Sequence, residues 1–514
     1  MKTKLIYTFL IAGLVGTGCV KHFDDLNTDP NSPSLENPAV AAGAANALFS
    51  SAISRGLMLS NEFQRVQALY ADLYGQYFAT SATYFNSDRY QVNQAWLDAG
   101  WNLFYPRDIK NLVDIIKSPN ANNNQKQIAR IWKVFLFHRM VDFYGDIPYF
   151  DAGDPTKPEK FDNQREIYAD FFKELTEAVN AIDAGGSYDA KDVIYAGNTT
   201  KWKAFGNTLR LRLALRISNV DPAKAKAEAE AAIAAGVFSG NADNALAKVS
   251  NQLPNALNQI TGFNEFRMSA TMESIMNGYK DPRIGEFFSP VGSTGDAAYV
   301  GKFNGIRNGV STTDLGLAEN QNKNNSNVGL RFSTDNQFTN PRIVLTYAEA
   351  CFLLAEAKLK GYAGPGDAKT WYENGIRASM NQFGITNSAL ISAYLSSETD
   401  LPTIPAQTTV PVSLLPVAFS EVEAEQMEQI QIQKWLAVYP DGFEAWANFR
   451  RTGFPRFYTP ANYDPTSDVT PGSFIQRLPY TDNMKSRNAS GVAAAETRMG
   501  GNGQAVKLWF AGGN

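Results

Sequence analysis

The fold is decided by the stretch RIVLTYAEACFLLAEAKLKGYAGPGDAKTWYENGIRASMNQF, which spans residues 342–383. Its apolar residues recur with a period near 3.6 on both sides of a glycine-rich turn, which is the pattern of two amphipathic helices. Gly361 and Gly384 follow the two helices, as is usual at helix ends. Small side chains lie where two helices could approach closely: Ala348, Ala355, Ala357 and Ala368. The stretch therefore predicts a closely packed helix pair.

The same period extends over most of the chain, and residues 201–235 contain a second pair. Repeated helix pairs are typical of tetratricopeptide architecture, which occurs here without the full repeat consensus. The expected fold class is therefore all-α, built from tetratricopeptide-like helix pairs. We predict helices at residues 40–60, 62–79, 94–117, 123–144, 163–183, 201–219, 222–235, 342–361, 367–383, 420–438 and 442–450.

The helical period is lost in three segments. Residues 284–340 hold eight Gly and nine Asn, and a loop of this length is usually functional or disordered. Residues 400–416 are rich in proline, and residues 452–514 show no helical pattern, so we expect both to cover the helices with short strands at most. Since no linker separates these parts, we expect one large domain over residues 19–514.

The N-terminus has the pattern of a secretory signal at residues 1–18. MKTK precedes an apolar stretch from Leu5 to Val15, which is too short to span a bilayer. Small residues then precede Cys19, as in a bacterial lipobox, in which the cysteine is acylated and becomes the mature N-terminus. An ordinary signal peptide with an incidental Cys19 is the alternative. We expect a protein that is lipid-anchored at a membrane, outside the cytoplasm.

Composition excludes several function classes. A net charge of −4, with no run of five basic residues, argues against nucleic-acid binding. Cys19, Cys351, His22 and His138 are the only cysteines and histidines, so neither a disulfide framework nor a zinc site is expected, and no motif indicates a cofactor. No nucleophile motif is present, so we expect no enzyme activity. A glycoside hydrolase, which needs only two carboxylates, stays as the enzymatic alternative.

Six segments in order resemble the SusD/RagB family of outer-membrane nutrient-binding lipoproteins of Bacteroidetes. They are FDDLNTDPNSP after Cys19, RMVDFYGDIPYFDA at 139–152, DPRI at 281, TYAEACFLLAEAKLKG at 346, QKWLAVYPDGFEAWANFRRTGFPR at 433 and KLWF at 507. The resemblance implies four tetratricopeptide-like helix pairs that sit as a lid on a SusC-like TonB-dependent transporter. It also implies capture of a nutrient without catalysis, usually an oligosaccharide and in some members a peptide.

Aromatic residues concentrate in two aperiodic segments. Flat rings stack on the C–H faces of sugars, while amides, carboxylates and arginines bond sugar hydroxyls. Packing of these loops on the core is the alternative interpretation. The predicted ligand-binding residues are Tyr84, Phe85, Asp88, Arg89, Tyr90 and Trp96 in the first segment, and Tyr299, Phe303, Asn304, Asn308 and Arg331 in the second.

Three other conspicuous features favour structural roles. Asp146 lies in the turn FYGDIPYF, where glycine and proline at a helix end suffice to explain the pattern. Asp441 and Glu444 start a helix, a position that favours acidic residues for capping alone. Arg450 and Arg451 close that helix and complement its dipole.

Overall fold

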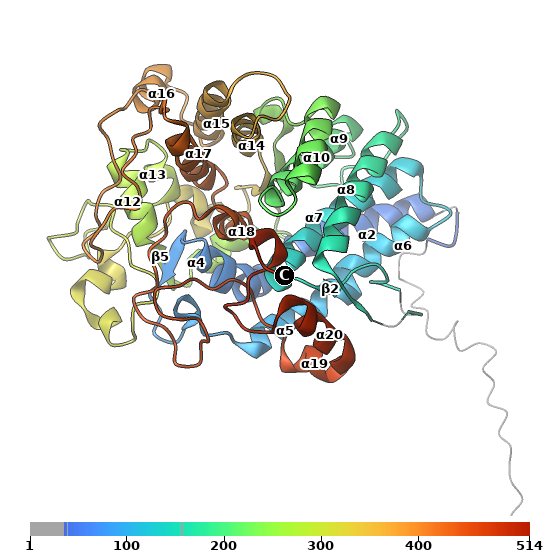
Figure 1. The fold of residues 1–514 in the computed structure, drawn as a ribbon, viewed down its shortest axis with the longest axis horizontal. Helices are drawn as coiled ribbons and strands as arrows, with labels where there is room; N and C mark the ends of the chain where they lie inside the picture. The colour runs from blue at the N-terminus through green and yellow to red at the C-terminus, as the bar shows by residue number, and fades with distance from the viewer. Residues whose placement is uncertain (1–34, 39, 155, 158) are drawn as a thin grey trace, which may run out of the picture.

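A computed structural model describes residues 35–38, 40–154, 156–157 and 159–514 (Figure 1). The predicted signal peptide, Cys19, His22 and the segment FDDLNTDPNSP lie outside the described residues. The fold is largely helical, as expected. The longer helices are α2 (Ala41–Gly56), α5 (Gln94–Leu103), α6 (Lys110–Lys117), α7 (Asn123–Tyr144), α8 (Gln164–Ala181), α9 (Thr199–Arg216), α10 (Pro222–Ala235), α12 (Ala270–Gly278), α14 (Tyr347–Leu359), α15 (Ala368–Gln382), α16 (Ser388–Leu395), α17 (Glu423–Ala437), α18 (Gly442–Thr452) and α20 (Ala489–Met499).

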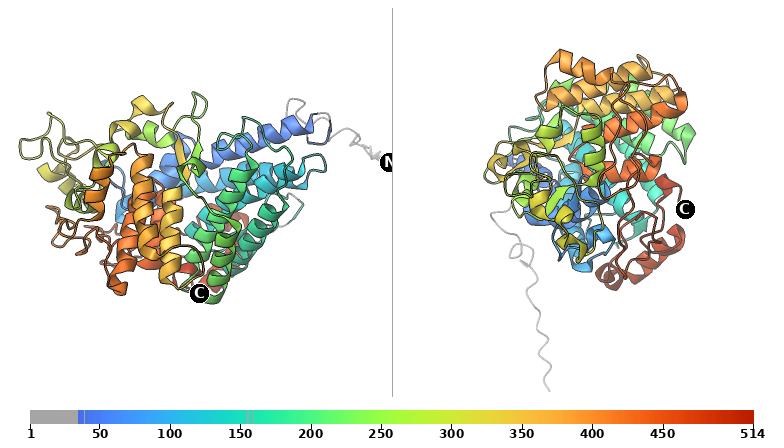
Figure 2. Two further views of the ribbon diagram at one scale, coloured as in Figure 1. Left: turned by 90° about the horizontal axis from the view of Figure 1, so that it is seen from above. Right: turned by 90° about the vertical axis from the view of Figure 1, so that its left-hand side faces the viewer.

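The helices pack in sequential pairs. Helix α7 packs on α6 and α8, α9 on α8 and α10, and α14 on α15 and α17. In Figure 2 these helices lie side by side in a row. Ala348, Ala355 and Ala357 are buried, as expected at helix contacts, whereas Ala368, predicted to have the same role, is only half-buried at the start of α15. A Cβ atom at Gly375 of α15 would lie 2.7 Å from the Phe352 ring of α14, so the pair depends on small residues.

Shorter elements connect the helical layers. Residues 60–74 form one continuous helical segment from α3 (Ser60–Phe63) through η2 (Gln64–Ala71) to α4 (Asp72–Tyr74), and η4 (Phe104–Ile109) joins α5 to α6. Three two-stranded antiparallel sheets are present in the described residues. They pair β1 (Phe78–Thr80) with β5 (Phe266–Met268), β2 (Ile147–Pro148) with β3 (Phe161–Asp162), and β4 (Ala245–Ala247) with β6 (Arg342–Leu345).

Three of the sequence predictions are wrong in part. The helix expected at residues 62–79 ends at Tyr74, and Phe78–Thr80 forms strand β1. Residues 342–345, expected to begin a helix, form strand β6, in which Ile343 pairs with Leu246 and Leu345 with Ala245 of β4. The C-terminal region, expected to be irregular, contains α19 (Asp482–Arg487) and α20. Both helices are capped by polar side chains, Thr481 and Asn488. They were missed because their sequences lack a strong apolar period.

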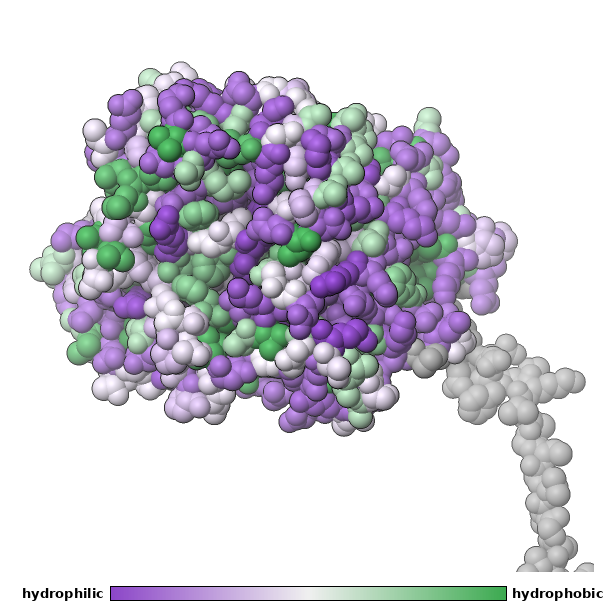
Figure 3. Space-filling view, in the orientation of Figure 1, coloured by the Kyte–Doolittle hydropathy of each residue, from purple (hydrophilic) through white to green (hydrophobic). Residues whose placement is uncertain are grey.

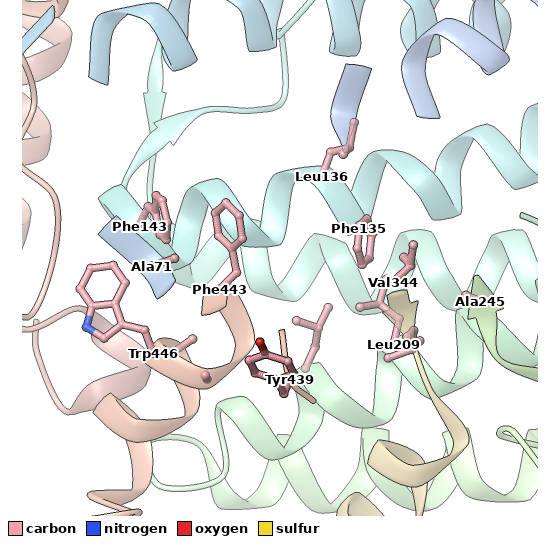
Figure 4. Packing of buried hydrophobic residues seen from close by; sticks show 14 of the residues in the cluster. Ala71, Phe135, Leu136, Phe143, Leu209, Ala245, Val344, Tyr439, Phe443 and Trp446 are labelled. Carbon is pink, nitrogen blue, oxygen red and sulfur yellow. The ribbon is translucent and has the colours of Figure 1, made fainter. Parts of the chain in front are cut away.

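Helices from both halves of the chain meet in one hydrophobic core. Buried residues from Ala45 to Phe510 belong to the same cluster. In the part shown in Figure 4, Phe143 of α7 faces Phe443 and Trp446 of α18. The Phe143 and Phe443 rings stack with centroids 4.5 Å apart. On the face shown in Figure 3 the surface is mostly hydrophilic, with apolar side chains in separate groups.

A buried ionic cluster lies within this core. Glu444 of α18 contacts Arg216 of α9 at 2.5 Å and Lys434 of α17 at 2.8 Å, and all three side chains are at most 2% exposed. Next to them, Arg212 makes two hydrogen bonds to the Glu349 carboxylate of α14, 2.6 and 2.7 Å long. These charges tie four helices together through paired, desolvated groups.

Residues 284–340 contain no long helix, as predicted. Apart from α13 (Ile284–Phe287), the segment consists of turns, short 3₁₀ helices and isolated bridges. It is held to the scaffold by the bridge between Ser269 and Ile306, and by a hydrogen bond from the Met268 amide to the Ser326 carbonyl, 3.0 Å long. No helix within the described ranges combines the length and apolar character that a membrane crossing requires.

Candidate binding site

The loop that follows β1 is fixed by its pairing with β5. The Ser81 amide donates to the Glu265 carbonyl at 2.9 Å, and the Thr80 hydroxyl donates to the same oxygen at 3.2 Å. This places residues 81–90 beside residues 263–267, although the two segments are 185 residues apart in sequence. In Figure 1 the blue β1 loop and the yellow insertion both lie at the left of the molecule near β5.

Tyr84 presents its ring to solvent. The residue is 66% exposed, and its hydroxyl donates to a Glu265 carboxylate oxygen at 2.6 Å. The other oxygen of this carboxylate accepts from the Gln64 side-chain amide, also at 2.6 Å. Because the hydroxyl is held by a carboxylate, the pKa of Tyr84 is raised. The ring is therefore exposed and yet fixed in orientation, as a stacking platform requires.

Phe85 and Trp96 support Tyr84 from beneath. The Phe85 ring contacts the Tyr84 ring edge-on at a centroid distance of 4.7 Å. It also contacts the Trp96 ring at 5.7 Å and stacks on Phe266 of β5 at 6.2 Å. Both Phe85 and Trp96 are partly buried against the core. The structure thus brings three of the predicted aromatic residues into one cluster.

A polar cavity of about 360 Å³ is lined in part by Asn264 and Arg267 of the segment formed by residues 263–267. Phe263, at the start of this segment, is 53% exposed. Most lining side chains are amides, hydroxyls or cations, which can donate to or accept from sugar hydroxyls. The cavity is lined by Asn264, Arg267, Ser289, Pro290, Val291, Gly292, Thr294, Asn322, Lys323, Asn325 and Asn327.

Arg267 is the most unusual residue of the cavity. Only 5% of it is exposed, and among the described residues its guanidinium pairs with no carboxylate within salt-bridge distance. It donates instead to the carbonyls of Phe266, at 2.7 Å, and Asn322, at 3.1 Å, and to the side chain of Asn264. Burial lowers the pKa of Arg267 to about 10. A buried cation held by neutral groups is a common feature of ligand sites.

Tyr299, one of the predicted residues, does not line the cavity. It is half-buried in the turn formed by residues 296–302, whose backbone pairs with Val291 of the cavity lining. Asp296 of this turn bonds Lys323 and accepts from the Asn324 amide at 2.8 Å, and these contacts lower its pKa. Tyr299 therefore lies on a turn that is tied to the cavity wall by other residues.

Three predicted ligand contacts are buried, which contradicts their predicted roles. Tyr90 is 4% exposed because its ring packs between Tyr74 and Tyr463. Asn308 is also 4% exposed, and its side chain donates to the Leu73 and Phe78 carbonyls. Asp88 accepts from the Thr80 amide at 3.3 Å, and burial raises its pKa to about 7. These residues hold the loops in place.

The other four predicted residues also make contacts within the fold. Arg89 donates to Asn86 within its own turn. The Phe303 side chain packs against the core, and the Asn304 amide donates to Asn325 at 2.8 Å. Arg331 forms an ion pair with Glu286 at 2.9 Å and does not line the cavity. Of these four, only Asn304 touches the cavity wall.

The features interpreted as structural have structural contacts. Asp146 is 1% exposed and accepts from the Gln164 amide at 2.9 Å and from Arg498 at 2.6 Å. Asp441 caps α18 and pairs with Arg139, while Glu444 belongs to the ionic cluster. Arg450 stacks on Trp446, with its guanidinium carbon 3.7 Å from the ring centroid. The carboxylates of α18 are therefore engaged in the core.

The sequence analysis missed Arg267, Glu265 and Phe263. All three lie in the segment FNEFRM, which is too short and too mixed to show a period. The exposed Phe263 between Gly262 and Asn264 was the one available signal, because an aromatic residue in a turn is not needed for a helix face. The buried position of Arg267 follows only from the pairing of β1 with β5.

Residues 25–511 match the family described as SusD-like, Susd and RagB outer membrane lipoprotein. Among solved structures, the chain is similar to a chitin-binding SusD homologue from Flavobacterium johnsoniae, with 30% identity and a TM-score of 0.82 over 91% of this chain and 98% of that one. A SusD homologue from Bacteroides vulgatus has 28% identity and a TM-score of 0.81 over 91% and 97%. A further chitin-binding protein has 28% identity and a TM-score of 0.75 over 91% and 100%. No protein of curated function matches the sequence.

Proposed function

We propose, from the premise that this chain belongs to the SusD/RagB family of outer membrane lipoproteins, that it is a surface-exposed lipoprotein that captures an oligosaccharide. In this proposal the protein delivers the oligosaccharide to a SusC-like TonB-dependent transporter. The observation that carries the proposal is Tyr84, an exposed ring fixed by Glu265 beside a cavity lined by amides. One sugar ring would stack on Tyr84, and the next rings would reach the cavity, where Arg267 and the asparagines bond hydroxyl groups.

The first ligand to test is an oligosaccharide of N-acetylglucosamine. Two of the similar structures are described as chitin-binding. The cavity supports this choice, because an acetamido group presents a carbonyl that the Arg267 guanidinium and the asparagine amides can donate to. A peptide ligand, the alternative within the family, also contains amide carbonyls. Peptides are therefore the comparison ligand in the binding assay.

Tyr84→Ala should weaken oligosaccharide binding about fivefold or more. A stacking contact contributes about 1 kcal/mol or more, and a tenfold change in affinity corresponds to about 1.4 kcal/mol. The melting temperature should change little, because Tyr84 is largely exposed. Titration calorimetry with chitooligosaccharides, with other glycans and with short peptides measures the effect.

The control is Leu390→Ala, which removes an exposed apolar side chain of α16 that lies outside the cavity. It should leave affinity unchanged. Equal binding by wild type and Tyr84→Ala would refute the proposed platform. If peptides bind tightly and no glycan binds, the ligand is a peptide and not an oligosaccharide.

Anchoring and delivery are tested by the behaviour of Cys19. Cys19→Ala should release the protein from the membrane fraction and abolish incorporation of labelled palmitate, because no other anchor is proposed. Affinity purification of the tagged wild type from outer membranes should recover a large barrel protein. Recovery of the bait alone under mild detergent would contradict the transporter partnership, and absence of acyl label in the wild type would contradict the anchor.

We propose no catalysis at this site. A glycoside hydrolase needs a carboxylic acid whose pKa is raised, close to a second carboxylate. At the cavity rim the Lys323 ammonium and the Asn324 amide lower the pKa of Asp296. Glu265 is engaged by Tyr84 and Gln64 on both oxygens. Incubation with the bound glycan should therefore release no product, and product in excess of the protein concentration would favour the hydrolase alternative.

A further inference from the structure

The geometry points to a second, separate saccharide pocket between η4 and residues 148–154, which would take a short neutral sugar of one or two rings. This inference rests on the proposed function, because it assigns a second site for the same class of ligand. The cavity has a volume of about 400 Å³, within the range of small-molecule sites. Its floor is formed by Trp101, Tyr105, Pro106 and Pro148.

The floor is apolar and is held by neighbouring rings. Trp101 is 6% exposed, and its ring stacks on Phe161 of β3 with planes 13° apart and centroids 6.0 Å apart. Tyr144 contacts Trp101 edge-on at 5.3 Å, and Tyr105 lies against it at 4.9 Å. The Trp101 ring, fixed in this way, gives the cavity an apolar wall against which the C–H face of a sugar can pack.

Two polar atoms at the floor have no partner within the described part of the chain. The side-chain carbonyl oxygen of Asn102 and the hydroxyl of Tyr105 are both buried, and neither makes a hydrogen bond there. Buried polar atoms are almost always paired, so an unpaired couple beside a cavity calls for a specific explanation. Small adjustments of these side chains on binding would pair them with ligand hydroxyls.

The charges at the rim select the class of ligand. Lys157 and Arg487 form no salt bridge among the described residues, and they line the cavity together with Lys110, Lys160, Asp151, Asp154 and Glu159. Because the two signs of charge nearly balance, the cavity favours neither a strongly anionic nor a strongly cationic ligand over a neutral one. A purely apolar ligand would bury Asn102 without a partner. Sugar hydroxyls both donate and accept, so they can serve both signs of charge.

The pocket is distinct from the site around Tyr84. The two cavities share no lining residue. Trp96 lies in the first turn of α5 and Asn102 in its last turn, and a rise of about 1.5 Å per residue separates them by about 9 Å along the axis. The helix therefore contributes to a different candidate site at each end.

The test is calorimetry on the purified protein in a detergent without a sugar head group. It counts the binding sites for two neutral disaccharides, which are cellobiose and the disaccharide of N-acetylglucosamine. Asn102→Leu combined with Arg487→Ala should remove one of two sites, with a loss of at least tenfold in affinity there. Leucine in place of Asn102 removes an unpaired buried group, so the melting temperature should not fall. Lys191→Ala, an exposed lysine outside both cavities, is the control and should retain both sites.

The outcomes separate this inference from the proposed function. A single site that disappears in Tyr84→Ala and is unaffected by the double variant would overturn the second pocket while leaving the first site intact. A single site that disappears only in the double variant would support the pocket and overturn the platform at Tyr84. Absence of binding by every disaccharide would overturn both.

Discussion

Replacing Glu444 by glutamine should lower the free energy of unfolding by about 3–5 kcal/mol, because it leaves buried cations without their counter-charge. Arg216 and Lys434 both contact this carboxylate and are themselves almost fully buried. Burial alone would raise the pKa of Glu444, but Arg216, Lys434 and Arg212 more than offset that effect and hold the pKa below its usual range. Urea denaturation monitored by tryptophan fluorescence measures the loss.

Glu373→Gln is the matched control. Glu373 pairs with Arg377 one helical turn away on the surface of α15, where such a pair contributes no more than about 0.5 kcal/mol. Similar losses in the two variants would show that the cluster around Glu444 is not a tightly coupled structural unit.

Asp72→Asn should remove a pH dependence of stability in the neutral range. Asp72 is fully buried between α4 and α18, where one carboxyl oxygen accepts from Gln67 at 3.1 Å and the other has no partner in the described structure. Burial raises the pKa of Asp72 from 3.8 to about 8, with a smaller contribution from the nearby Asp441. The folded state therefore holds this proton more tightly than the unfolded state does.

The sign follows from linkage. Stability supplied by the protonated Asp72 is fully present below pH 4 and is lost as the pH rises towards 8, by about 1.4 kcal/mol per pH unit. From pH 5 to pH 7 the wild type should lose about 3 kcal/mol more than Asp72→Asn. Urea midpoints at a series of pH values measure the difference. Asp114→Asn, which changes a partly exposed carboxylate, should follow the wild type. Parallel curves for wild type and Asp72→Asn would contradict the prediction.

The sequence predicted the helical scaffold well because its signal is local. Helix α7 was predicted at residues 123–144, its observed bounds, since Asn122 caps its start and Gly145 ends it. Apolar period and capping depend only on neighbours within a few residues. Strand β6 was mistaken for helix because its partner β4 lies about a hundred residues earlier, and pairing over that distance leaves no local pattern.

The candidate site was predicted less well for the same reason. Tyr84, Phe85 and Trp96 were singled out because aromatic residues in an aperiodic loop are conspicuous, and their rings do form one cluster, while their role in binding stays a prediction. Tyr90 belongs to the same stretch, but Tyr463, from a distant segment, covers its ring. Composition cannot distinguish a ring that is covered from one that is exposed. Likewise, Arg267 becomes a cavity residue only when Asn322 of the insertion closes over it.

Because β1 pairs with β5, the candidate ligand site can form only after a long part of the chain has been synthesised. Thr80 and Glu265 are 185 residues apart, and the cavity beside them also needs residues near 325. The entropy cost of closing a loop grows only slowly with the length of the loop. The order of synthesis, and not a loss of stability, therefore determines when this part of the structure can form. A chain that ends before residue 320 lacks part of the cavity lining even where its early helices have formed. Retention on a glycan column should therefore be lost in chains that end before residue 320.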